Sequence, residues 1–443
     1  MPRGFTSVTG IDRLIFALAW PNIISNLSVP LLGIADMAMM GHMPSPVYIG
    51  AVALGSVIFN FIYSGLSFLR MGTTGMTALR FGATDEEGIV GVLRTSLLTA
   101  FALGLALILA SPLISQIGFS LLGGTPQTRQ LALSYFNIRI MAAPAVMLQY
   151  VVQGWFIGMQ NARFPMYVAL IENVLNILLN LFFVLVLGMG SDGVALGTVI
   201  ARYAGLAAAF FFLKSSFPQY LQSLFTSRSR SKGIPLASFF TLNLNLFVRT
   251  LLLIFVLSTF TAWSARQGEL ILAANSLLLQ FFYFFSYFTD GFAHAAESLT
   301  GRFKGGTLIL RLRIFVSRIM TMGALLALAF TLIYWAAAPF LLRLLTSQAQ
   351  VYQVACLYLP YIWAVPLVSF AAFIWDGIYI GATAARTLRN VMIPASIGFL
   401  IIPPLGHYSN HLLWLAFLLF LLFRSLGLWW AAPRAIFRTN TYA

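Results

Sequence analysis

The sequence predicts an all-α integral membrane protein in which twelve transmembrane helices form two pseudo-symmetric six-helix bundles. Of its 443 residues, 60% are hydrophobic and only 8% are charged, a composition that soluble globular domains do not have. Apolar runs long enough to cross a bilayer follow one another along the chain. One such run in each half ends in a similar motif, which indicates that the halves are related.

Runs of roughly 20 or more apolar residues, the length that crosses the hydrocarbon core, define the predicted helices. They lie at about 14–40, 49–70, 91–117, 131–158, 165–189, 193–215, 236–262, 270–298, 315–345, 352–381, 390–407 and 411–431. Several runs exceed the minimum length, so we expect helices that tilt or extend beyond the bilayer.

The basic residues predict the orientation of these helices. The chain has 26 Lys and Arg against 11 Asp and Glu, and most basic residues lie in every second connection. Because Lys and Arg accumulate in cytoplasmic loops, we expect both termini in the cytoplasm and the protein in the plasma membrane. The positive charge is then a topology signal, and no nucleic-acid partner is expected.

The longest polar connection, residues 215–233, predicts the division into domains. It contains the run Ser227-Arg-Ser-Arg-Ser-Lys232 and has six apolar runs on either side. We therefore expect an N-terminal six-helix lobe at 1–214, a cytoplasmic connecting loop, and a C-terminal six-helix lobe at 234–443.

A motif shared by the fourth and tenth runs suggests an internal repeat. The fourth ends Gln153-Gly-Trp-Phe-Ile-Gly-Met-Gln-Asn-Ala-Arg163, and the tenth ends Asp376-Gly-Ile-Tyr-Ile-Gly-Ala-Thr-Ala-Ala-Arg386. Gly, Ile, Gly, Ala and Arg recur at the same offsets. Duplication would relate two bundles by an axis along the membrane normal, with a cavity between them. A chance match between two glycine-rich helix ends is the alternative.

Asp36 is the most informative single residue. It lies in the apolar run Leu31–Met40, far from any basic residue. A carboxylate at membrane depth is unfavourable by several kcal/mol unless it is neutralised, paired or hydrated, and such residues usually line ion or substrate paths. A carboxyl group held away from water also exchanges protons nearer neutral pH. Asp36 therefore predicts a proton-driven transporter.

The fifth run carries four polar side chains, Glu172, Asn173, Asn176 and Asn180. Spacings of three and four place them on one helical stripe, which must face protein or water because lipid cannot satisfy amides. They either hold helices together through hydrogen bonds or line a hydrated cavity shared with Asp36. Arg202 on the next run is a candidate partner for Glu172.

The second half has its own charged residues within the apolar runs. Asp290, His294 and Glu297 share a helical face by their spacing, and Asp376 ends the tenth run. Pairing of these acids with Arg302, Arg386 or Arg389 is the favoured interpretation, and a metal site at Asp290, His294 and Glu297 is the alternative that we rank lowest. Arg249 and Arg139 lie deep enough to need partners that the sequence does not identify.

The aromatic run Phe281–Phe288 has two interpretations. It either packs against neighbouring helices and lipid, which we favour, or forms an aromatic cavity wall for flat or cationic substrates.

Motifs of enzyme chemistry are missing from the sequence. It contains no phosphate-binding loop, nucleophile elbow or HExxH, its four histidines are scattered, and it has one cysteine, Cys356. We therefore expect no enzyme activity, no cofactor and no bound metal.

These residues resemble the multidrug and toxic compound extrusion (MATE) transporters, especially their DNA-damage-inducible, DinF-like branch. The resemblance covers essentially the whole chain. Its first-helix pattern of proline, acid and glycine is matched by Pro21, Asp36 and Gly41. It implies that Asp36 is the cation-coupling carboxylate, that the first helix bends near Pro21, and that Thr198 lines the same pocket.

The chain departs from that family's pattern at two positions. Many members have Asp where this sequence has Asn180, and some have an acid in the seventh helix, where Arg249 is the only charge. The first departure weakens a sodium site and favours proton coupling. Because of the second, the resemblance supports no coupling site in the C-terminal lobe.

The resemblance implies a secondary-active antiporter that exports amphipathic, often cationic drugs or toxins in exchange for H⁺, with Na⁺ less favoured. It would act by alternating access, as a monomer, in a bacterial inner membrane. The alternative within the same superfamily is a flippase for lipids or lipid-linked oligosaccharides, for which only Arg139, Arg202 and Arg249 could bind phosphates. A membrane-embedded enzyme or a scaffold is the least favoured alternative.

Overall fold

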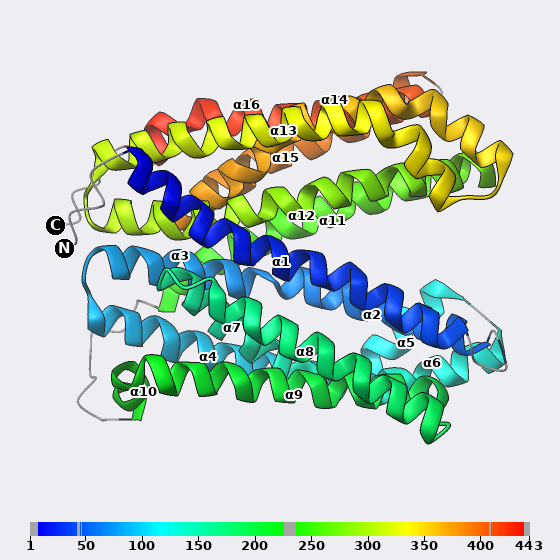
Figure 1. Cartoon of the computed structure of the whole chain (residues 1–443), viewed down its shortest axis with the longest axis horizontal. Coiled ribbons are helices and arrows are strands. Elements are labelled where there is room, and N and C mark those ends of the chain that lie inside the picture. Colours follow the sequence, from blue (N-terminus) through cyan, green and yellow to red (C-terminus); the bar gives the residue numbers. More distant parts are fainter. Residues whose placement is uncertain are drawn as a thin grey trace. The chain divides into compact units, whose positions relative to one another are not determined.

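The computed structural model describes residues 8–41, 45, 47–123, 125–225, 236–406 and 409–437, with most of their side chains. The helices in chain order are α1 (Val8–Gly41), α2 (Val47–Leu66), α3 (Phe68–Gly82), α4 (Glu86–Leu109), α5 (Ser111–Leu122), α6 (Pro126–Arg139), α7 (Ala143–Gly158), α8 (Arg163–Leu181), α9 (Gly190–Ser216), α10 (Pro218–Phe225), α11 (Leu236–Arg266), α12 (Glu269–Gly305), α13 (Ile309–Leu345), α14 (Ala349–Gly381), α15 (Ala385–Ile401) and α16 (Asn410–Ala435) (Figure 1). Short 3₁₀ or π turns lie at Ile140–Ala142, Phe182–Val186 and Pro403–Gly406. These residues include no strand, which confirms the all-α prediction.

Eleven helical stretches in the described part of the chain are long and apolar enough to cross a membrane. The eleventh predicted run, 390–407, is not among them: it corresponds to α15, which has 17 residues and ends just before Pro403 and Pro404. Proline has no backbone N–H to donate, so two in succession stop the helix. The eleven membrane-length apolar helices make the chain an integral membrane protein.

The chain forms two compact units whose boundaries differ from the predicted lobes. Within the described residues, the C-terminal unit combines residues 8–23, 78–84 and 239–437, and the N-terminal unit combines residues 24–77 and 85–238. The divisions fall inside α1 and inside α3, so each of these helices contributes to both units. The predicted C-terminal lobe, 234–443, leaves out residues 8–23 and 78–84, although these two segments belong to the C-terminal unit.

Close backbone packing explains why those two segments belong with the C-terminal helices. A methyl group added at Gly291 of α12 would collide with Ile23 and approach the Ala19 carbonyl of α1. One added at Gly301 would collide with Ala78. Glycine has no side chain, so these helices approach more closely than larger residues would allow.

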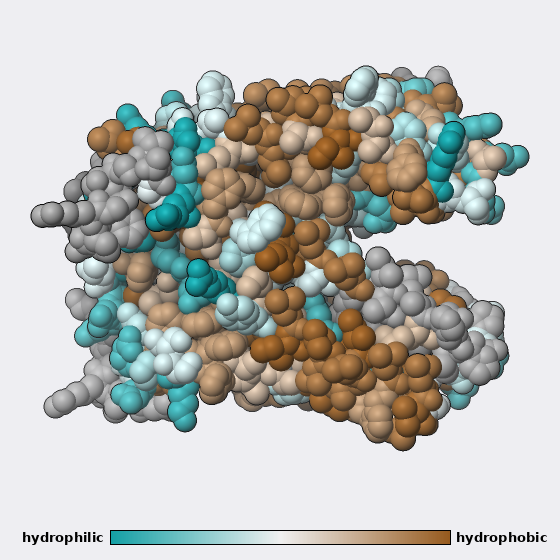
Figure 2. All heavy atoms as spheres, in the orientation of Figure 1, coloured by the Kyte–Doolittle hydropathy of each residue, from teal (hydrophilic) through white to brown (hydrophobic). Residues whose placement is uncertain are grey.

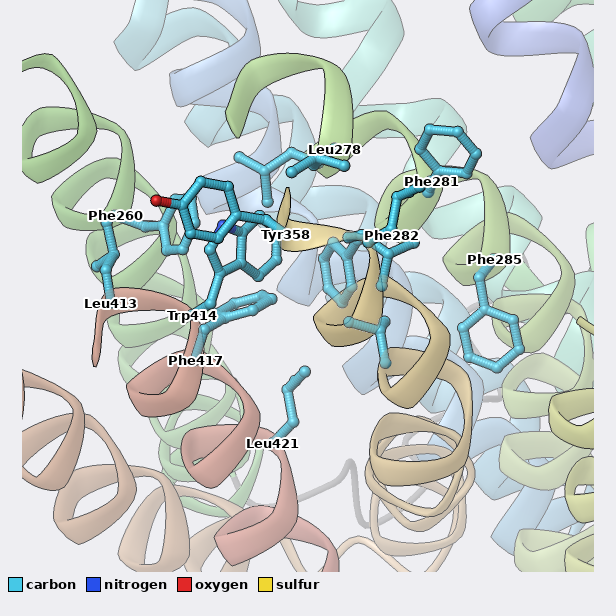
Figure 3. Close-up of a cluster of buried hydrophobic side chains, with 14 of the residues drawn as sticks. Phe260, Leu278, Phe281, Phe282, Phe285, Tyr358, Leu413, Trp414, Phe417 and Leu421 are labelled. Atoms are coloured by element: carbon cyan, nitrogen blue, oxygen red, sulfur yellow. The ribbon is translucent and has the colours of Figure 1, made fainter. Parts of the chain in front are cut away.

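The C-terminal unit has a large aromatic core. Phe281, Phe282 and Phe285 of α12 are buried there, and they lie among rings and leucines from α11, α14 and α16 (Figure 3). Phe284 of the same run is 47% exposed. The aromatic run therefore mainly packs against neighbouring helices, as the favoured interpretation predicted.

Backbone conformation supports the internal repeat. Four described non-glycine residues have positive φ, which is uncommon outside glycine: Thr84, Gln160, Thr307 and Thr383, with φ of 55°, 64°, 56° and 56°. Thr84 and Thr307 are 223 positions apart, and so are Gln160 and Thr383. The same strained turns therefore recur at a constant offset.

Helix packing repeats at the same offset. A methyl group at Gly154 of α7 would collide with the Arg70 carbonyl, and one at Gly377 of α14 would collide with the Ala293 carbonyl. Gly154 and Gly377 are 223 positions apart, as are Arg70 and Ala293. Chance similarity of two helix ends does not account for this, so the structure favours duplication.

The surface also has the character of a membrane protein. On the face shown in Figure 2, apolar side chains cover most of the middle of the helices, and polar side chains gather toward the helix ends. Exposed Leu, Phe and Trp side chains are numerous, such as Leu109 at 82% and Trp430 at 75%. A bilayer covers such surface without the penalty that it would have in water.

Candidate functional site

The site in the N-terminal unit depends on close contact between α8 and α9. One face of α9 carries Gly193, Gly197, Ala201, Gly205 and Ala209, all buried and four residues apart. Small residues at this spacing let two membrane helices approach closely. A methyl group at Gly197 would collide with Oδ1 of Asn180, and one at Gly205 would crowd Glu172. The glycines therefore provide the space for the polar side chains of α8.

Glu172 is buried at the centre of an ionic cluster. Its Oε1 lies 2.5 Å from Nη1 of Arg202, and its Oε2 accepts a hydrogen bond of 3.1 Å from Nε2 of Gln149. The same Gln149 nitrogen donates to the Arg202 carbonyl at 2.8 Å. The predicted Glu172–Arg202 pair is confirmed, and Gln149 was missed, although it is an isolated amide in an apolar run.

Asn176, Asn180 and Thr198 form a polar ladder between α8 and α9. Nδ2 of Asn180 donates to Oδ1 of Asn176 at 3.0 Å, and Nδ2 of Asn176 donates to Oγ1 of Thr198 at 3.1 Å. The Thr198 hydroxyl in turn donates to the Val194 carbonyl at 2.8 Å. The ladder supplies neutral oxygen atoms, and it joins residues that sequence reasoning assigned to one pocket.

Asn173 leaves the stripe and turns toward α1. Its Nδ2 donates to Oγ of Ser28 at 2.7 Å. Asn173 is part-buried, whereas Glu172, Asn176 and Asn180 are at most 4% exposed. α8 therefore presents one polar edge to α9 and another to α1, the helix that carries Asp36.

Asp36 lies in the helical backbone of α1, two turns beyond Ser28. Its side chain is outside the described part of the structure, as are those of Met37 and Met40. The Ser28–Asn173 hydrogen bond fixes the preceding part of α1 against α8 within the same unit.

Pro21 is buried in α1 just before the division between the two units. Having no N–H, it cannot bond to the Ala17 carbonyl. Asn22 beside it donates from its side chain to the Leu18 carbonyl at 2.7 Å, which competes with the backbone ladder. α1 is thus locally weakened where it passes from one unit to the other.

The C-terminal unit contains a buried carboxylate held by two arginines. Oδ2 of Asp376 accepts hydrogen bonds from Nη2 of Arg249 and, at 2.6 Å, from Nη2 of Arg424. All three side chains are at most 8% exposed. The prediction that Asp376 pairs with Arg302, Arg386 or Arg389 is wrong, because it faces α11 and α16 inside the unit.

Asp290, His294 and Glu297 form no metal site. In the part of the chain that the structure describes, no group of three or more His, Cys, Asp or Glu side chains is arranged to hold a metal ion. Glu297 is 2% exposed, while its backbone carbonyl packs against Gly381 of α14. At Glu297, the backbone of α12 therefore lies directly against α14.

Arg139 obtains partners that the sequence did not identify. Its Nη1 donates to Oγ of Ser56 at 3.0 Å and to the hydroxyl of Tyr135. The guanidinium carbon lies 4.8 Å from the centroid of the Phe59 ring, a cation–π arrangement. Tyr135 could have been anticipated from its i, i+4 spacing, but Ser56 and Phe59 come from α2.

A comparison against protein families identifies the family of this chain. A family model described as MatE matches residues 21–182 and 246–404. The chain belongs to the MatE family. The two matched segments contain Pro21, Asp36, the polar stripe of α8, and Asp376.

Individual MatE relatives cover nearly the whole chain. DNA damage-inducible protein F of Escherichia coli strain K12 is 35% identical over 425 residues, which are 95% of this chain and 92% of that protein. The probable multidrug resistance protein NorM of Photorhabdus laumondii is 25% identical, over 76% of this chain and 74% of that protein. The name of the second relative associates that protein with multidrug resistance.

Solved structures of MatE-type transporters have the same fold. A transporter of the MOP superfamily from Pyrococcus furiosus has a TM-score of 0.86 at 20% identity, covering 97% of both chains. An outward-facing multidrug resistance MATE family transporter gives 0.87 at 20% identity, again over 97% of both chains. This likeness confirms the predicted fold class.

Proposed function

We propose that this chain is a secondary-active antiporter that exports amphipathic, often cationic organic compounds in exchange for protons. Asp36 is the coupling carboxylate, and Asn173, Asn176, Asn180, Thr198 and Glu172 form the polar side of the same pocket. The chain acts as a monomer. MatE membership and the naming of relatives as multidrug resistance proteins support the transport class.

The observation that carries the proposal is that two of the buried acids, Glu172 and Asp376, are held by arginines. Glu172 lies 2.5 Å from Arg202, and Asp376 bonds to both Arg249 and Arg424. Each carboxylate is thus held in a fixed geometry by at least one guanidinium group, so we assign both acids to the structure of the fold and not to proton exchange. Asp36 lies on a helix whose neighbouring polar groups, Ser28 and Asn173, are neutral.

The polar ladder supports a proton rather than sodium as the driving ion. A buried cation needs compensating negative charge, and Asn180 supplies none. Oδ1 of Asn176 already accepts from Asn180, and the Thr198 hydroxyl accepts from Asn176. The Asn176 oxygen and the Thr198 hydroxyl are therefore engaged within the ladder, which is neutral, and the ionisation of Asp36 is the charge change.

In the proposed mechanism, the charge of Asp36 selects between conformations. Ionised Asp36 keeps the pocket hydrated or engaged with a cationic substrate, and protonation removes that charge. A ligand shifts a conformational equilibrium only through its different affinities for the two states, and here the proton is that ligand. Bending of α1 near Pro21 accompanies the change, because the proline donates no backbone hydrogen bond there and Asn22 binds the Leu18 carbonyl.

The decisive test is transport in proteoliposomes with pH and sodium gradients imposed separately. Wild-type protein should export a cationic dye when driven by a pH gradient, and Asp36→Asn should insert normally but lose this activity. Asp192→Asn is a matched control, since Asp192 lies at the start of α9 and accepts a hydrogen bond from Ser134. Efflux driven by a pH gradient in Asp36→Asn would refute the proposal.

We further propose that both termini face the cytoplasm of a bacterium. The beginning of α1 and the end of α16 lie at the same end of the C-terminal unit (Figure 1), which agrees with an even number of crossings. The excess of Lys and Arg in alternate connections supports the cytoplasmic side.

A flippase that binds phosphates is disfavoured, because two of the three arginines that could bind a phosphate are already paired with carboxylates. Arg202 is neutralised by Glu172 and Arg249 by Asp376. Of the three candidates, Arg139 alone is held by hydroxyls and rings without a carboxylate among the described residues. A headgroup with several phosphates would have few positive charges to bind.

A further inference from the structure

A groove in the C-terminal unit has features that the transport proposal does not use. It has a volume of about 770 Å³ and lies between α13, α14 and α16. Apolar side chains line most of it: Val316 and Met320 from α13, Phe370 and Trp375 from α14, and Trp429 from α16. The whole groove lies within a single compact unit.

The length of the groove matches one leaflet of a bilayer. Its lining along α13 extends from Arg313 to Ala324. Eleven residues of α-helix rise by about 16 Å, close to half of the roughly 30 Å hydrocarbon core. One extended acyl chain therefore fits along it.

Two of the three serine and threonine hydroxyl groups that line the groove donate to backbone carbonyls. Thr321 donates to the Ser317 carbonyl at 2.9 Å, and Ser425 donates to the Val368 carbonyl at 2.9 Å. The middle of the groove therefore presents an apolar surface to its occupant. This suits a hydrocarbon chain better than a polar solute.

One end of the groove is positively charged. Exposed Arg313 lines the groove near the start of α13, with its guanidinium carbon 5.7 Å from the Phe437 ring centroid. Exposed Arg434 is not part of the lining, but its guanidinium carbon lies 6.0 Å from the ring centroid of Trp430, which is. No acidic side chain of the described residues is within 4 Å of either guanidinium. Such arginines are suited to bind a phosphate, and they repel cationic amphiphiles.

A second groove in the same unit lacks this charge. It has a volume of about 330 Å³, lies between α15 and α16, and is lined only by apolar residues such as Pro394, Phe399 and Leu422. It offers a surface for lipid chains of any kind. The larger groove differs because an apolar channel and two cationic groups occur together.

We propose that the groove between α13, α14 and α16 binds one anionic phospholipid from the adjacent leaflet. One acyl chain lies along Met320 and Phe370, and the phosphate binds Arg313 and Arg434. Bound lipid would fill the space between the ends of α13 and α16. The proposal requires only that these helices span the membrane, so it is independent of the transport substrate and of the coupling ion.

The test is native mass spectrometry of the purified full-length protein, with phosphatidylglycerol and phosphatidylcholine of identical chains as probes. Wild-type protein should retain phosphatidylglycerol preferentially. Replacing both Arg313 and Arg434 by Gln should lower its retention by about fivefold or more, the effect of removing one or two cationic groups from an anionic surface. Retention of phosphatidylcholine should not change.

Two further variants separate charge from shape. Arg343→Gln removes a similar guanidinium, which lies 5.1 Å from the Tyr352 ring at the opposite end of α13, and it should retain phosphatidylglycerol as wild type does. Ala371→Trp fills the groove from α14 and should reduce retention of both lipids. Circular dichroism and thermal unfolding establish that each variant is folded.

Three results would overturn the proposal. The first is equal retention of phosphatidylglycerol by the wild type and the double arginine variant, and the second is an equal loss in Arg343→Gln. The third is competitive displacement of the lipid by a transported organic cation, which would assign the groove to substrates instead.

Discussion

At the scale of single residues, what matters is whether a buried charge has a fixed partner. Asp376 serves two guanidinium groups with one oxygen, and Glu172 divides its two oxygens between Arg202 and Gln149. Burying a charge without a partner is strongly unfavourable. These clusters are therefore fixed parts of the fold, which distinguishes them from an acid that must change its charge.

Replacing Asp376 by Asn should strongly destabilise the protein. The substitution leaves Arg249 and Arg424 buried without a counter-charge, which should cost about 3–5 kcal/mol. Thermal unfolding in detergent, followed by tryptophan fluorescence, measures this loss. Glu269→Gln removes an exposed acid from α12 and should change stability little. An unchanged melting temperature for Asp376→Asn would contradict the assignment of the cluster to structure.

Replacing Asn180 by Asp should make transport respond to sodium. The new carboxylate would lie beside Asn176 and Thr198 and would add the negative charge that a buried cation needs. Dye efflux driven by a sodium gradient in proteoliposomes is the measurement. Asn173→Asp places the same charge on the edge of α8 that faces Ser28 and should not produce the response. Failure of Asn180→Asp to respond would show that the ladder alone does not determine ion choice.

At the scale of elements, α1 is divided between two environments. Before Pro21, Asp12 pairs with Arg318 of α13 through hydrogen bonds of 3.0 and 2.6 Å, and the Phe16 and Phe292 rings pack edge to face. Beyond Pro21, Ser28 bonds to Asn173 of α8. The early part of the helix is thus attached to the C-terminal unit and the later part to the N-terminal unit.

Reversing the Asp12–Arg318 pair should impair transport, and exchanging the two charges should restore it. Asp12→Arg or Arg318→Asp alone places like charges together and releases the start of α1 from α13, so efflux should fall severalfold. The pair is partly exposed, so a contribution to stability of only about 0.2–1 kcal/mol is expected. Dye efflux by the single and double variants measures the effect. If the double exchange stays as inactive as the single variants, the pair has no positioning role.

At the scale of the whole molecule, the two halves of the chain repeat one helical pattern, and two segments of the first half belong to the C-terminal unit. The recurrence of strained turns and glycine contacts 223 positions apart indicates two related sets of helices. The compact units nevertheless exchange parts of α1 and α3. α1 and α3, which belong to both units, therefore connect the units covalently.

This arrangement predicts how the chain behaves when it is divided. Co-expression of fragments 1–230 and 231–443 should restore transport, whereas fragment 231–443 alone should be unstable. The isolated fragment lacks Ala19 and Ile23, which cover Gly291, and Ala78, which covers Gly301. Its yield and its melting temperature after purification are the measurements. A C-terminal fragment that is as stable alone as when co-expressed would show that the exchanged segments contribute little.

The sequence alone determined the membrane class, the all-α fold, nearly all of the helices and the Glu172–Arg202 pair. These follow from local properties: the number of apolar residues in a row and the periodicity of polar residues along one helix or between neighbouring helices. Pairing of Asn176 with Asn180 follows from their i, i+4 spacing for the same reason.

Only the tertiary structure decided which distant residues meet. Arg249 and Arg424 converge on Asp376 from helices far apart in the chain; Arg139 is held by Ser56 and Phe59; and residues 8–23 of α1 join the C-terminal unit. Such pairings depend on how whole helices pack, and that packing is determined by small residues such as Gly291, Gly377 and Gly205. A glycine in the sequence shows that close approach is allowed, but the identity of the approaching helix depends on the folded chain.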